Sequence, residues 1–376
     1  MNILITGAEG FIGKNLHYWL SNMRKEDTIL TYDIGVSTNS RTLAELCRQA
    51  DFVFHLAGVN RPIDPKEFED GNAVLTREVV NYCREGKCPP IVLSSSAQAA
   101  QANPYGESKK AAEDVVFDYA KDTGSPVYVF RLPGVFGKWS RPNYNTVVAT
   151  FCYNIANDLP VEIRDPGFEL SLVYIDDVCR CFANMLVGQV EKDGGFYTVD
   201  PVHCISLGQL ADMVHSFKSS RQTLNISDMS DPLTLKLYST YLSYLPKFSY
   251  PLVTHADERG AFAEFLKSPT SGQVSVNITK PGYTKGNHWH QTKVEKFFTV
   301  SGQGVIRLRK IDEQSIYEYH VSGSKLEVVD IPSGYTHTIT NTGTEDLVTI
   351  IWVNEIFDPN NPDTFYLNVE EGQDNA

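Results

Sequence analysis

The hydrophobic pattern of the chain changes near residue 250, and this change constrains the fold more than any other feature. Before it, short and mostly apolar runs alternate with segments of helical character; the runs cover residues 3–5, 29–32, 52–55, 91–93 and 127–130. Strands that are apolar along their whole length are buried on both faces, as in a parallel sheet covered by helices on each side. We therefore expect residues 1–245 to form an α/β domain with a doubly wound parallel sheet.

Beyond this point the pattern is that of an all-β domain. Short stretches of alternating polarity, such as residues 274–278, 297–300 and 347–351, are separated by turns that contain glycine. Alternation of this kind is typical of antiparallel strands with one buried face. Residues 246–376 are therefore predicted to form an antiparallel barrel or sandwich.

Composition excludes several functional classes. The chain has 376 residues, and its 33 basic and 46 acidic side chains give a net charge of −13. This charge disfavours nucleic acid and anionic membranes as main partners, and no apolar run is long enough for a membrane-spanning helix. The seven cysteines are odd in number and all lie in the first 204 residues, which disfavours a secreted disulfide framework. We expect a cytoplasmic protein with reduced thiols.

A glycine-rich turn follows the first predicted strand. Gly7 and Gly10 come before Phe11 and Ile12, and Gly13 comes after them, at the start of the first predicted helix. Asp33 ends the second predicted strand. Glycines in this position let the backbone approach a pyrophosphate at a helix N-terminus, and the acidic residue accepts a hydrogen bond from a ribose hydroxyl. The pattern predicts a dinucleotide site.

A second group of residues has the spacing of an acid/base site. Ser96 ends a run of three serines after the strand at residues 91–93, and Tyr105 and Lys109 stand four residues apart. On a helix this spacing puts the tyrosine and the lysine on the same face. A lysine cation lowers the pKa of a neighbouring tyrosine, which can then exchange a proton with a carbinol.

Together these residues resemble the extended short-chain dehydrogenase/reductase family, whose members have a Rossmann-type fold and act mainly on nucleotide sugars. The resemblance covers about residues 1–245. It implies that Tyr105 is the acid/base, that Lys109 also binds the nicotinamide ribose, and that Ser96 hydrogen-bonds the reacting oxygen. The His55-Leu56-Ala57-Gly58 segment also matches, and its Leu56, Ala57 and Gly58 are expected at the cofactor.

Two departures from the family pattern limit the possible reaction types and the expected substrate contacts. The family's 4,6-dehydratases carry an Asp-Glu pair at the serine run, where this chain continues from Ser96 with Ala97-Gln98-Ala99. Dehydration is therefore disfavoured, and reduction or 4-epimerisation remains. The family's Arg-x-x-Asn segment reads Arg131-Leu-Pro-Gly134 here, so the asparagine contact to substrate is missing.

The C-terminal region carries a set of metal-binding residues. His288 and His290 stand two residues apart and therefore point to one face of a strand, and Glu295 and His337 complete the set. Imidazole and carboxylate ligands in this combination suit Zn²⁺ or another divalent first-row ion. The alternative is a barrel without metal, in which the histidines are packed and hydrogen-bonded.

The same residues resemble the cupin family. Residues 282–302 match its G-x5-H-x-H-x4-E-x6-G motif at every fixed position, and residues 332–341 match P-x-G-x2-H-x3-N. The glycine expected six residues before Pro332 is Leu326, a difference in a turn rather than in a ligand. The resemblance implies a cupin barrel over residues 246–376.

Substrate contacts are predicted in both domains. The segment 257–264 resembles part of the nucleotide-sugar 3,5-epimerases, which implies a substrate contact for Arg259; an ordinary surface salt bridge is the alternative. Lys285 and Lys293 flank the metal motif, where they would face an anionic sugar nucleotide or simply be solvated. In the N-terminal domain the candidates are Arg131, Lys138 and Asn143.

A reductase followed by a metal cupin resembles a family of bifunctional, usually dimeric capsular polysaccharide enzymes. That resemblance implies a cupin that epimerises carbon 3 of a UDP-2-acetamido-2,6-dideoxy-4-hexulose, a UDP-linked 4-keto-6-deoxy N-acetylhexosamine. A reductase then reduces its 4-keto group, toward UDP-N-acetyl-L-fucosamine for capsule or O-antigen polysaccharide. The family's usual reductant is NADPH, whereas Asp33 favours NADH because it would repel a 2′-phosphate; Arg41 could offset that repulsion.

Two other interpretations remain open. In one, the chain is a simple 4-ketosugar reductase or epimerase with a non-catalytic, sugar-binding or dimerising cupin. In the other, it is a redox sensor without catalysis, against which the intact pair of Tyr105 and Lys109 argues.

Overall fold

The computed structural model describes residues 1–34, 42–188 and 195–370. Within the described chain two compact units are formed, one by residues 1–215 and 235–246 and the other by residues 216–234 and 247–376. The division into two domains at residues 245/246 remains a prediction. The two compact units do not fully follow this boundary, because residues 216–234 belong to the second unit. Arg41 lies outside the described residues.

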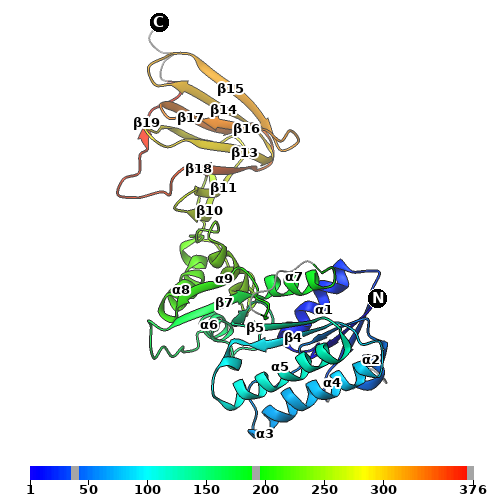
Figure 1. Cartoon of the computed structure of the whole chain (residues 1–376). Helices are drawn as coiled ribbons and strands as arrows, with labels where there is room; N and C mark the ends of the chain where they lie inside the picture. The colour runs from blue at the N-terminus through cyan, green and yellow to red at the C-terminus, as the bar shows by residue number, and fades with distance from the viewer. Residues whose placement is uncertain (35–41, 189–194, 371–376) are drawn as a thin grey trace. The chain divides into compact units, whose positions relative to one another are not determined.

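The first unit is built on a five-stranded parallel sheet with the strand order β2-β1-β3-β4-β5. Figure 1 labels β4 and β5 of this sheet, with α4 and α5 beside them. The strands are β1 (Asn2–Thr6), β2 (Thr28–Tyr32), β3 (Phe52–His55), β4 (Ile91–Ser96) and β5 (Val127–Leu132). The connecting segments contain α1 (Phe11–Met23), α2 (Leu43–Gln49), α3 (Lys66–Phe68), a π-helical segment (Glu69–Val74), α4 (Leu75–Arg84), a 3₁₀ turn (Ala97–Ala100) and α5 (Pro104–Thr123).

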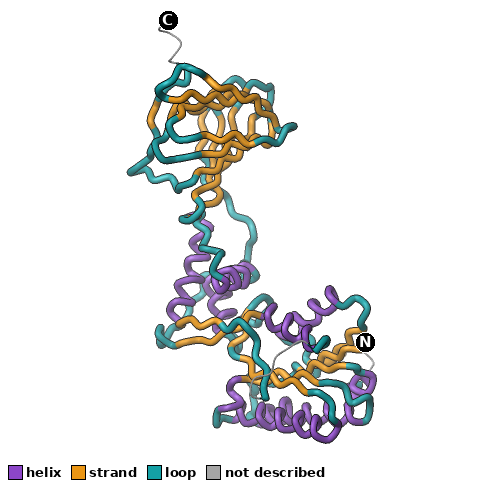
Figure 2. Tube along the Cα trace, turned by 45° about the horizontal axis from the view of Figure 1, so that its top comes forward, coloured by secondary structure: helices purple, strands orange, loops and turns teal. Residues whose placement is uncertain are grey.

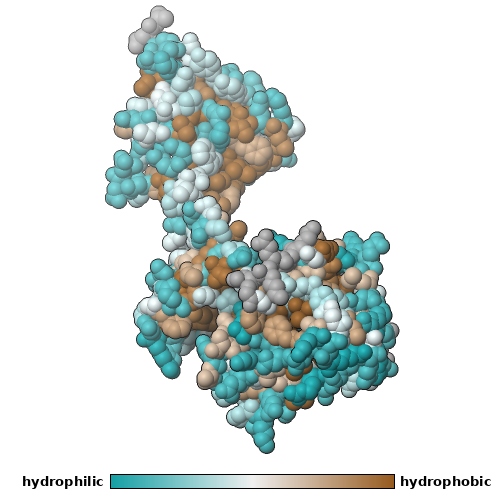
Figure 3. All heavy atoms as spheres, viewed as in Figure 1, coloured by the Kyte–Doolittle hydropathy of each residue, from teal (hydrophilic) through white to brown (hydrophobic). Residues whose placement is uncertain are grey.

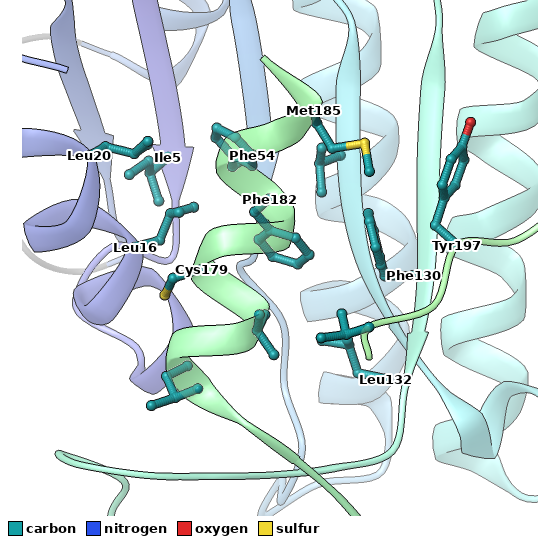
Figure 4. Close-up of a cluster of buried hydrophobic side chains, with 14 of the residues drawn as sticks. Ile5, Leu16, Leu20, Phe54, Phe130, Leu132, Cys179, Phe182, Met185 and Tyr197 are labelled. Carbon is teal, nitrogen blue, oxygen red and sulfur yellow. The ribbon is translucent and has the colours of Figure 1, made fainter. Parts of the chain in front are cut away.

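Each strand of this sheet supplies side chains to two hydrophobic cores. In β1, Ile3 and Ile5 belong to the core under α1 and α7 (Ile175–Met185), whereas Leu4 belongs to the core under α2, α4 and α5. Alternate residues of a strand point to opposite faces, so a strand between two helical layers must be apolar throughout. Figure 4 shows the first of these cores, with helical and strand side chains in contact: Leu16, Leu20, Cys179, Phe182, Ile5, Phe54 and Phe130. The predicted doubly wound α/β fold is confirmed.

A small sheet with the order β6-β7-β8 extends this unit. Its strands are β6 (Gly134–Phe136), β7 (Glu169–Tyr174) and β8 (His203–Ser206). The remaining helices are α6 (Val147–Ala156), α7 (Ile175–Met185), α8 (Leu207–Thr223) and α9 (Pro232–Leu242). Nowhere in the described chain is there a helix of sufficient length and apolarity to cross a membrane.

The second unit contains two antiparallel sheets, with the orders β16-β13-β18-β11-β10-β9 and β15-β14-β17-β12-β19. Figure 2 shows residues 255–369 as strands and connecting loops. The strands are β9 (His255–Asp257), β10 (Gly260–Ser268), β11 (Gly272–Thr279), β12 (Thr284–Trp289), β13 (Glu295–Ser301), β14 (Gln303–Lys310), β15 (Ile316–Ser322), β16 (Val328–Ile331), β17 (Tyr335–Asn341), β18 (Leu347–Val353) and β19 (Phe365–Tyr366).

Alternation decides which face of these strands is buried. In β18 every second residue, from Leu347 to Val353, is buried, and the intervening residues are partly exposed. Side chains from both sheets, including Phe297, Ile306, Ile339 and Ile351, form one hydrophobic cluster between them. The predicted all-β, cupin-like C-terminal fold is confirmed.

Candidate active site and metal centre

The glycine-rich turn between β1 and α1 is closely packed against its surroundings. Gly7 has a φ of +73°, and a Cβ on it would lie 2.6 Å from the amide nitrogen of Ala57. A Cβ on Gly13 would lie 2.0 Å from the carbonyl oxygen of Gly7. Gly10, which is exposed, is the N-cap of α1, and the partly exposed Phe11 and Ile12 form its first turn, so the backbone N–H groups of this helix N-terminus can bind a phosphate group. These residues fit a dinucleotide cofactor.

Asp33 lies at the end of β2 beside this turn. Its carboxylate oxygens accept hydrogen bonds from the backbone N–H of Glu9 at 3.2 and 3.1 Å. Partial burial raises the pKa of Asp33, and the backbone hydrogen bonds oppose that rise. The residue therefore ties the glycine-rich turn to β2 in addition to any contact with a ribose.

Leu56, Ala57 and Gly58 follow β3, and Gly58 lies next to Lys109. The N–H of Ala57 donates to Thr6 Oγ1 at 3.4 Å, and a Cβ on Gly58 would lie 3.2 Å from Lys109 Nζ. The preceding His55 is fully buried between Thr6 Oγ1 (2.7 Å) and Thr76 Oγ1 (2.9 Å). Burial lowers the pKa of His55 to about 3, so this histidine is a neutral structural residue.

Tyr105 and Lys109 lie on α5, and Ser96 ends β4. The hydroxyl of Tyr105 donates to Asn60 Oδ1 at 3.2 Å, and Lys109 Nζ donates to the carbonyl oxygen of Ser94 at 2.9 Å. Ser96 Oγ accepts from the N–H of Gln98. The fold thus places the three predicted side chains at the carboxyl end of β4 and on the helix that follows it.

The pKa of Tyr105 differs from the expectation. Burial raises it, and a hydrogen bond with Ser96 only partly opposes the rise. Lys109 is itself fully buried, and this burial lowers its pKa from 10.5 to about 8. The nearby carboxylate of Glu113 acts in the opposite direction and raises the pKa. Its ammonium group donates to the Ser94 carbonyl, and burial outweighs any effect of this cation on the pKa of Tyr105.

The three predicted substrate contacts of the first unit already have partners within the chain. The guanidinium of Arg131 forms two hydrogen bonds with Glu113, at 3.0 and 2.7 Å. Lys138 is paired with Asp176, and the amide of Asn143 donates to Asn154 Oδ1 at 3.0 Å. A substrate contact for any of them remains a prediction.

The predicted metal ligands come together in the second unit. His288 on β12, His290 just after it, Glu295 at the start of β13 and His337 on β17 have donor atoms within 4.8 Å of one another. His337 Nε2 lies 3.2 Å and His290 Nε2 lies 3.7 Å from the same oxygen, Glu295 Oε2. The atoms His290 Nε2, Glu295 Oε2 and His337 Nδ1 are buried without a hydrogen-bond partner. Buried polar atoms without partners are costly, so this cluster fits a metal ion.

The protonation states of His288 and Glu295 also suit metal binding. Burial and the neighbouring His337 lower the pKa of His288 to about 4. For Glu295, burial acts to raise the pKa, but the interactions with His290 and His337 outweigh it and hold the pKa well below its usual range. A neutral imidazole and an ionised carboxylate are the forms that bind metal.

A cavity of about 490 Å³ opens onto this cluster. Its lining combines the metal-binding residues with Lys285, Lys293, Glu264, Glu355 and apolar side chains such as Phe262 and Phe357. Lys285 Nζ donates to Asn277 Oδ1 at 2.9 Å and to the carbonyl oxygen of Ile278 at 2.8 Å, and burial lowers its pKa. Lys293 is buried and donates to the carbonyl oxygen of Pro362 at 2.5 Å.

Arg259 has a different environment from the two lysines. It is exposed, and its guanidinium bonds to Asp257 Oδ2 at 3.0 and 2.6 Å. This is the surface salt bridge that was the alternative for this residue. A contact of Arg259 with substrate therefore remains a prediction.

Two residues of these sites were not found from the sequence. Asn60 accepts the hydrogen bond of Tyr105, 45 residues away, and Asp363 bonds to His290 and to the turn after it, about 70 residues away. Neither residue belongs to a motif. Only their long-range contacts reveal them.

Comparison with known proteins agrees with this division of the chain. A family model described as "NAD dependent epimerase/dehydratase family" matches residues 3–199. The chain belongs to this family. A second model, "Polysaccharide biosynthesis C-terminal domain", matches residues 255–365.

The relatives include proteins that match the full length. The UDP-2-acetamido-2,6-beta-L-arabino-hexul-4-ose reductase of Pseudomonas aeruginosa is 44% identical over 375 residues, which are 99% of this chain and 100% of that protein. The crystal structure of the capsular polysaccharide assembling protein CapF from Staphylococcus aureus has a TM-score of 0.91 and 48% identity, covering 98% of this chain and 100% of that one. The chain is thus a CapF-like member of the family.

A more distant structure supports the fold of the first unit. The UDP-glucuronic acid 4-epimerase of Bacillus cereus, solved in complex with NAD, has a TM-score of 0.55 and 19% identity over 65% of this chain. At this identity the likeness concerns the fold alone.

Proposed function

We propose that this chain reduces the 4-keto group of a UDP-linked 2-acetamido-2,6-dideoxy-hexulose with NAD(P)H, as the name of its Pseudomonas relative indicates for that protein. The observation that carries the proposal is the placement of Tyr105 beside Ser96, with the buried cation of Lys109 one turn further along α5. A reductase needs a proton donor next to the carbonyl oxygen that becomes a hydroxyl, and this pair supplies it.

Each of the three residues has a defined task. Ser96 donates a hydrogen bond to the carbonyl oxygen of the sugar, and Tyr105 gives its phenolic proton to that oxygen. The raised pKa of Tyr105 keeps the phenol protonated before the reaction. Lys109 supplies a positive charge that favours the phenolate formed afterwards. The bound dinucleotide, held at the turn from Gly7 to Gly13, supplies the hydride.

The proposed reductant is NADPH, as the family resemblance implies. Asp33 is the residue that favours NADH instead. The carboxylate of Asp33 would repel a 2′-phosphate and accept a hydrogen bond from a 2′-hydroxyl. Comparing kcat/KM for NADPH and NADH, in the native chain and in Asp33→Asn, tests this choice. If Asp33 selects the cofactor, the variant shifts the ratio of the two values toward NADPH; an unchanged ratio contradicts that role.

For the second unit we propose epimerisation of carbon 3, with a bound Zn²⁺ held by His288, His290, Glu295 and His337. When bound, such an ion would act as a Lewis acid toward an enolate oxygen. The support is the cavity of about 490 Å³ that exposes this cluster to a sugar-sized molecule, with Lys285 and Lys293 as cations in its lining. We place epimerisation before reduction, because reduction removes the keto group that acidifies the hydrogen on carbon 3.

Proton NMR of the 4-keto sugar nucleotide in D2O, with the protein but without reduced cofactor, tests the epimerase. We expect deuterium at carbon 3 with the native chain and with Tyr105→Phe, and none with His290→Ala. Absence of exchange with the native, zinc-loaded chain would leave the alternative function, a reductase with a sugar-binding or dimerising cupin. Accumulation of a reduced but unepimerised sugar that is later converted would contradict the proposed order.

A cytoplasmic homodimer is part of the same proposal. The dimer is supported by three exposed apolar side chains near the edge strand β16. They are Val300, Leu326 and Val328, and their exposed fractions are 36%, 72% and 50%. Figure 3 shows hydrophobic side chains, in brown, gathered over the C-terminal strands. Sedimentation of the native chain and of Leu326→Ser with Val328→Ser tests this surface, and dissociation is the expected result for the double variant.

A further inference from the structure

The segment after β18, residues 354–369, pairs with β12, the strand that carries His288 and is followed directly by His290, and we call this segment the C-terminal strap. Within the strap, β19 pairs with β12, with His288 opposite Tyr366. The N–H of Leu367 donates to the carbonyl oxygen of Asn287 at 3.0 Å. The strap is therefore hydrogen-bonded along the backbone next to His288.

Asp363 connects the strap to the second ligand through its main chain. The carbonyl oxygen of Asp363 lies 2.5 Å from His290 Nδ1. A carbonyl oxygen only accepts hydrogen bonds, so Nδ1 must carry the ring proton. The other ring nitrogen, Nε2, is then the one with a lone pair, and it is the buried atom of His290 without a hydrogen-bond partner, 3.7 Å from Glu295.

The side chain of Asp363 holds the turn that joins His290 to Glu295. Its Oδ1 accepts from the N–H of Gln291 at 2.9 Å, and its Oδ2 accepts from the N–H groups of Thr292 and Lys293 at 2.9 and 3.1 Å. The Thr292 hydroxyl adds a fourth hydrogen bond, at 2.9 Å. Hydrogen bonds to an ionised acceptor are about twice as strong as neutral ones, so one carboxylate fixes the path of the whole turn.

The backbone of Asp363 is adapted to both contacts. Its φ of +38° lies in the left-handed region, which Asp tolerates better than most residues and which still carries a conformational cost. The contacts on the turn and on His290 offset that cost. A capped surface turn alone would not require the main-chain carbonyl to face a ring nitrogen.

We infer that Asp363 is the positioning residue of the metal centre. Its carbonyl selects the His290 tautomer that leaves Nε2 available for the ion, and its carboxylate fixes the turn that sets the spacing between His290 and Glu295. The inference rests on the proposed metal site and goes beyond it, because Asp363 is not itself a ligand. Partners of metal-bound histidines act in this way by fixing ring orientation and tautomer.

The test compares zinc affinity in the full chain after removal of metal by dialysis against a chelator. Competition with a chelating dye gives the Kd of Zn²⁺ for the native chain, Asp363→Ala, Asp363→Asn and a control, Asp358→Ala. Asp358 is a suitable control because it lies in the same strap and caps one backbone N–H, of Asn360, at 2.9 Å. We expect Asp363→Ala to bind Zn²⁺ about 10- to 100-fold more weakly, Asp363→Asn to fall between it and the native chain, and the control to be unchanged.

The outcomes separate this inference from the proposed metal site. A native chain that fails to bind Zn²⁺ overturns both, whereas a native chain that binds tightly while Asp363→Ala binds equally well overturns the role of the Asp363 carboxylate and leaves the metal site standing. Should the variant fail to fold, ¹⁵N NMR of labelled histidine in the native chain decides. His290, assigned with His290→Gln, should keep a protonated Nδ1 and shift at Nε2 when Zn²⁺ is added; coordination through Nδ1 would overturn the inference.

Discussion

Arg131 and Glu113 form a two-point ion pair between β5 and α5, with N–O distances of 3.0 and 2.7 Å. The glutamate side chain is almost fully buried, and it also accepts a hydrogen bond from Ser95 at 2.5 Å. The pair therefore joins the helix that carries Tyr105 and Lys109 to the strand next to β4. Since a buried carboxylate needs this partner, the pairing accounts for the arginine without any substrate.

Breaking this pair is expected to destabilise the first unit. Removal of one partner of a buried ion pair leaves the other uncompensated, at a cost of about 3 kcal/mol. We expect Glu113→Ala to lower the free energy of unfolding by about this amount in urea denaturation, and Glu162→Ala, which breaks the exposed pair with Arg164, to leave it unchanged. Equal behaviour of the two variants would contradict the structural role of Glu113.

Gly13 should be more sensitive to substitution than Gly10. A Cβ on Gly13 would lie 2.0 Å from the carbonyl oxygen of Gly7, whereas one on Gly10 would lie 3.1 Å from the same oxygen. Overpacking costs about 1–3 kcal/mol, and here it falls on the turn that we propose to hold the cofactor. Gly13→Ala should therefore melt at a lower temperature and bind NADPH more weakly than Gly10→Ala, as measured by nicotinamide fluorescence.

Tyr105 is expected to act in reduction alone. Loss of a general acid lowers the rate about 10²- to 10⁴-fold. In Tyr105→Phe we therefore expect kcat for the oxidation of NADPH by the keto sugar to fall by about this factor. Exchange at carbon 3 should persist, because the second unit has its own site. Tyr82→Phe, at a tyrosine on α4 that lies beside Arg48, is the control and should keep full activity. A loss of both activities in Tyr105→Phe would mean that the two sites are not independent.

The sequence was informative where the contacts are local. The strand pattern of residues 3–5, the turn from Gly7 to Gly13 and the pair His288 and His290 all lie within short segments, so spacing alone indicated their geometry. The pairing of Arg131 with Glu113 and the contact of Asp363 with His290 join residues 18 and 73 positions apart. No periodicity encodes such contacts, because they depend on how the sheets bring distant segments together.

The direction of the Tyr105 pKa shift was predicted wrongly for a related reason. Spacing placed Lys109 one turn from Tyr105, but it did not reveal that both groups are desolvated or that Nζ donates to the Ser94 carbonyl. Burial disfavours the charged forms of both residues. The chemistry of the pair depends on its surroundings as much as on its spacing.

Removal of metal should destabilise the second unit. A ligand at 100 times its Kd stabilises the folded state by about 2.7 kcal/mol, so calorimetry of the zinc-loaded native chain should show a lower melting temperature after a chelator is added. His290→Ala should melt at the same temperature with and without chelator, and His320→Ala, at an exposed histidine on β15, should respond like the native chain. Identical melting of the native chain in both conditions would exclude a stabilising ion.

Lys109 gives the chain a characteristic dependence of stability on pH. Burial lowers its pKa from 10.5 to about 8 in the folded chain, so between these pH values the unfolded chain binds more protons. The free energy of unfolding must therefore rise with pH across this window, by at most about 1.4 kcal/mol per unit, while below pH 8 the cost of the buried cation is present in full.

Urea denaturation between pH 7 and pH 10 should show this rise in the native chain and in Lys110→Met, whose lysine is exposed. Lys109→Met should lack it, because no titrating group remains at that position. The difference between the two variants isolates Lys109 from the other lysines and tyrosines, which contribute equally to both. Parallel curves would contradict the lowering of the Lys109 pKa by burial.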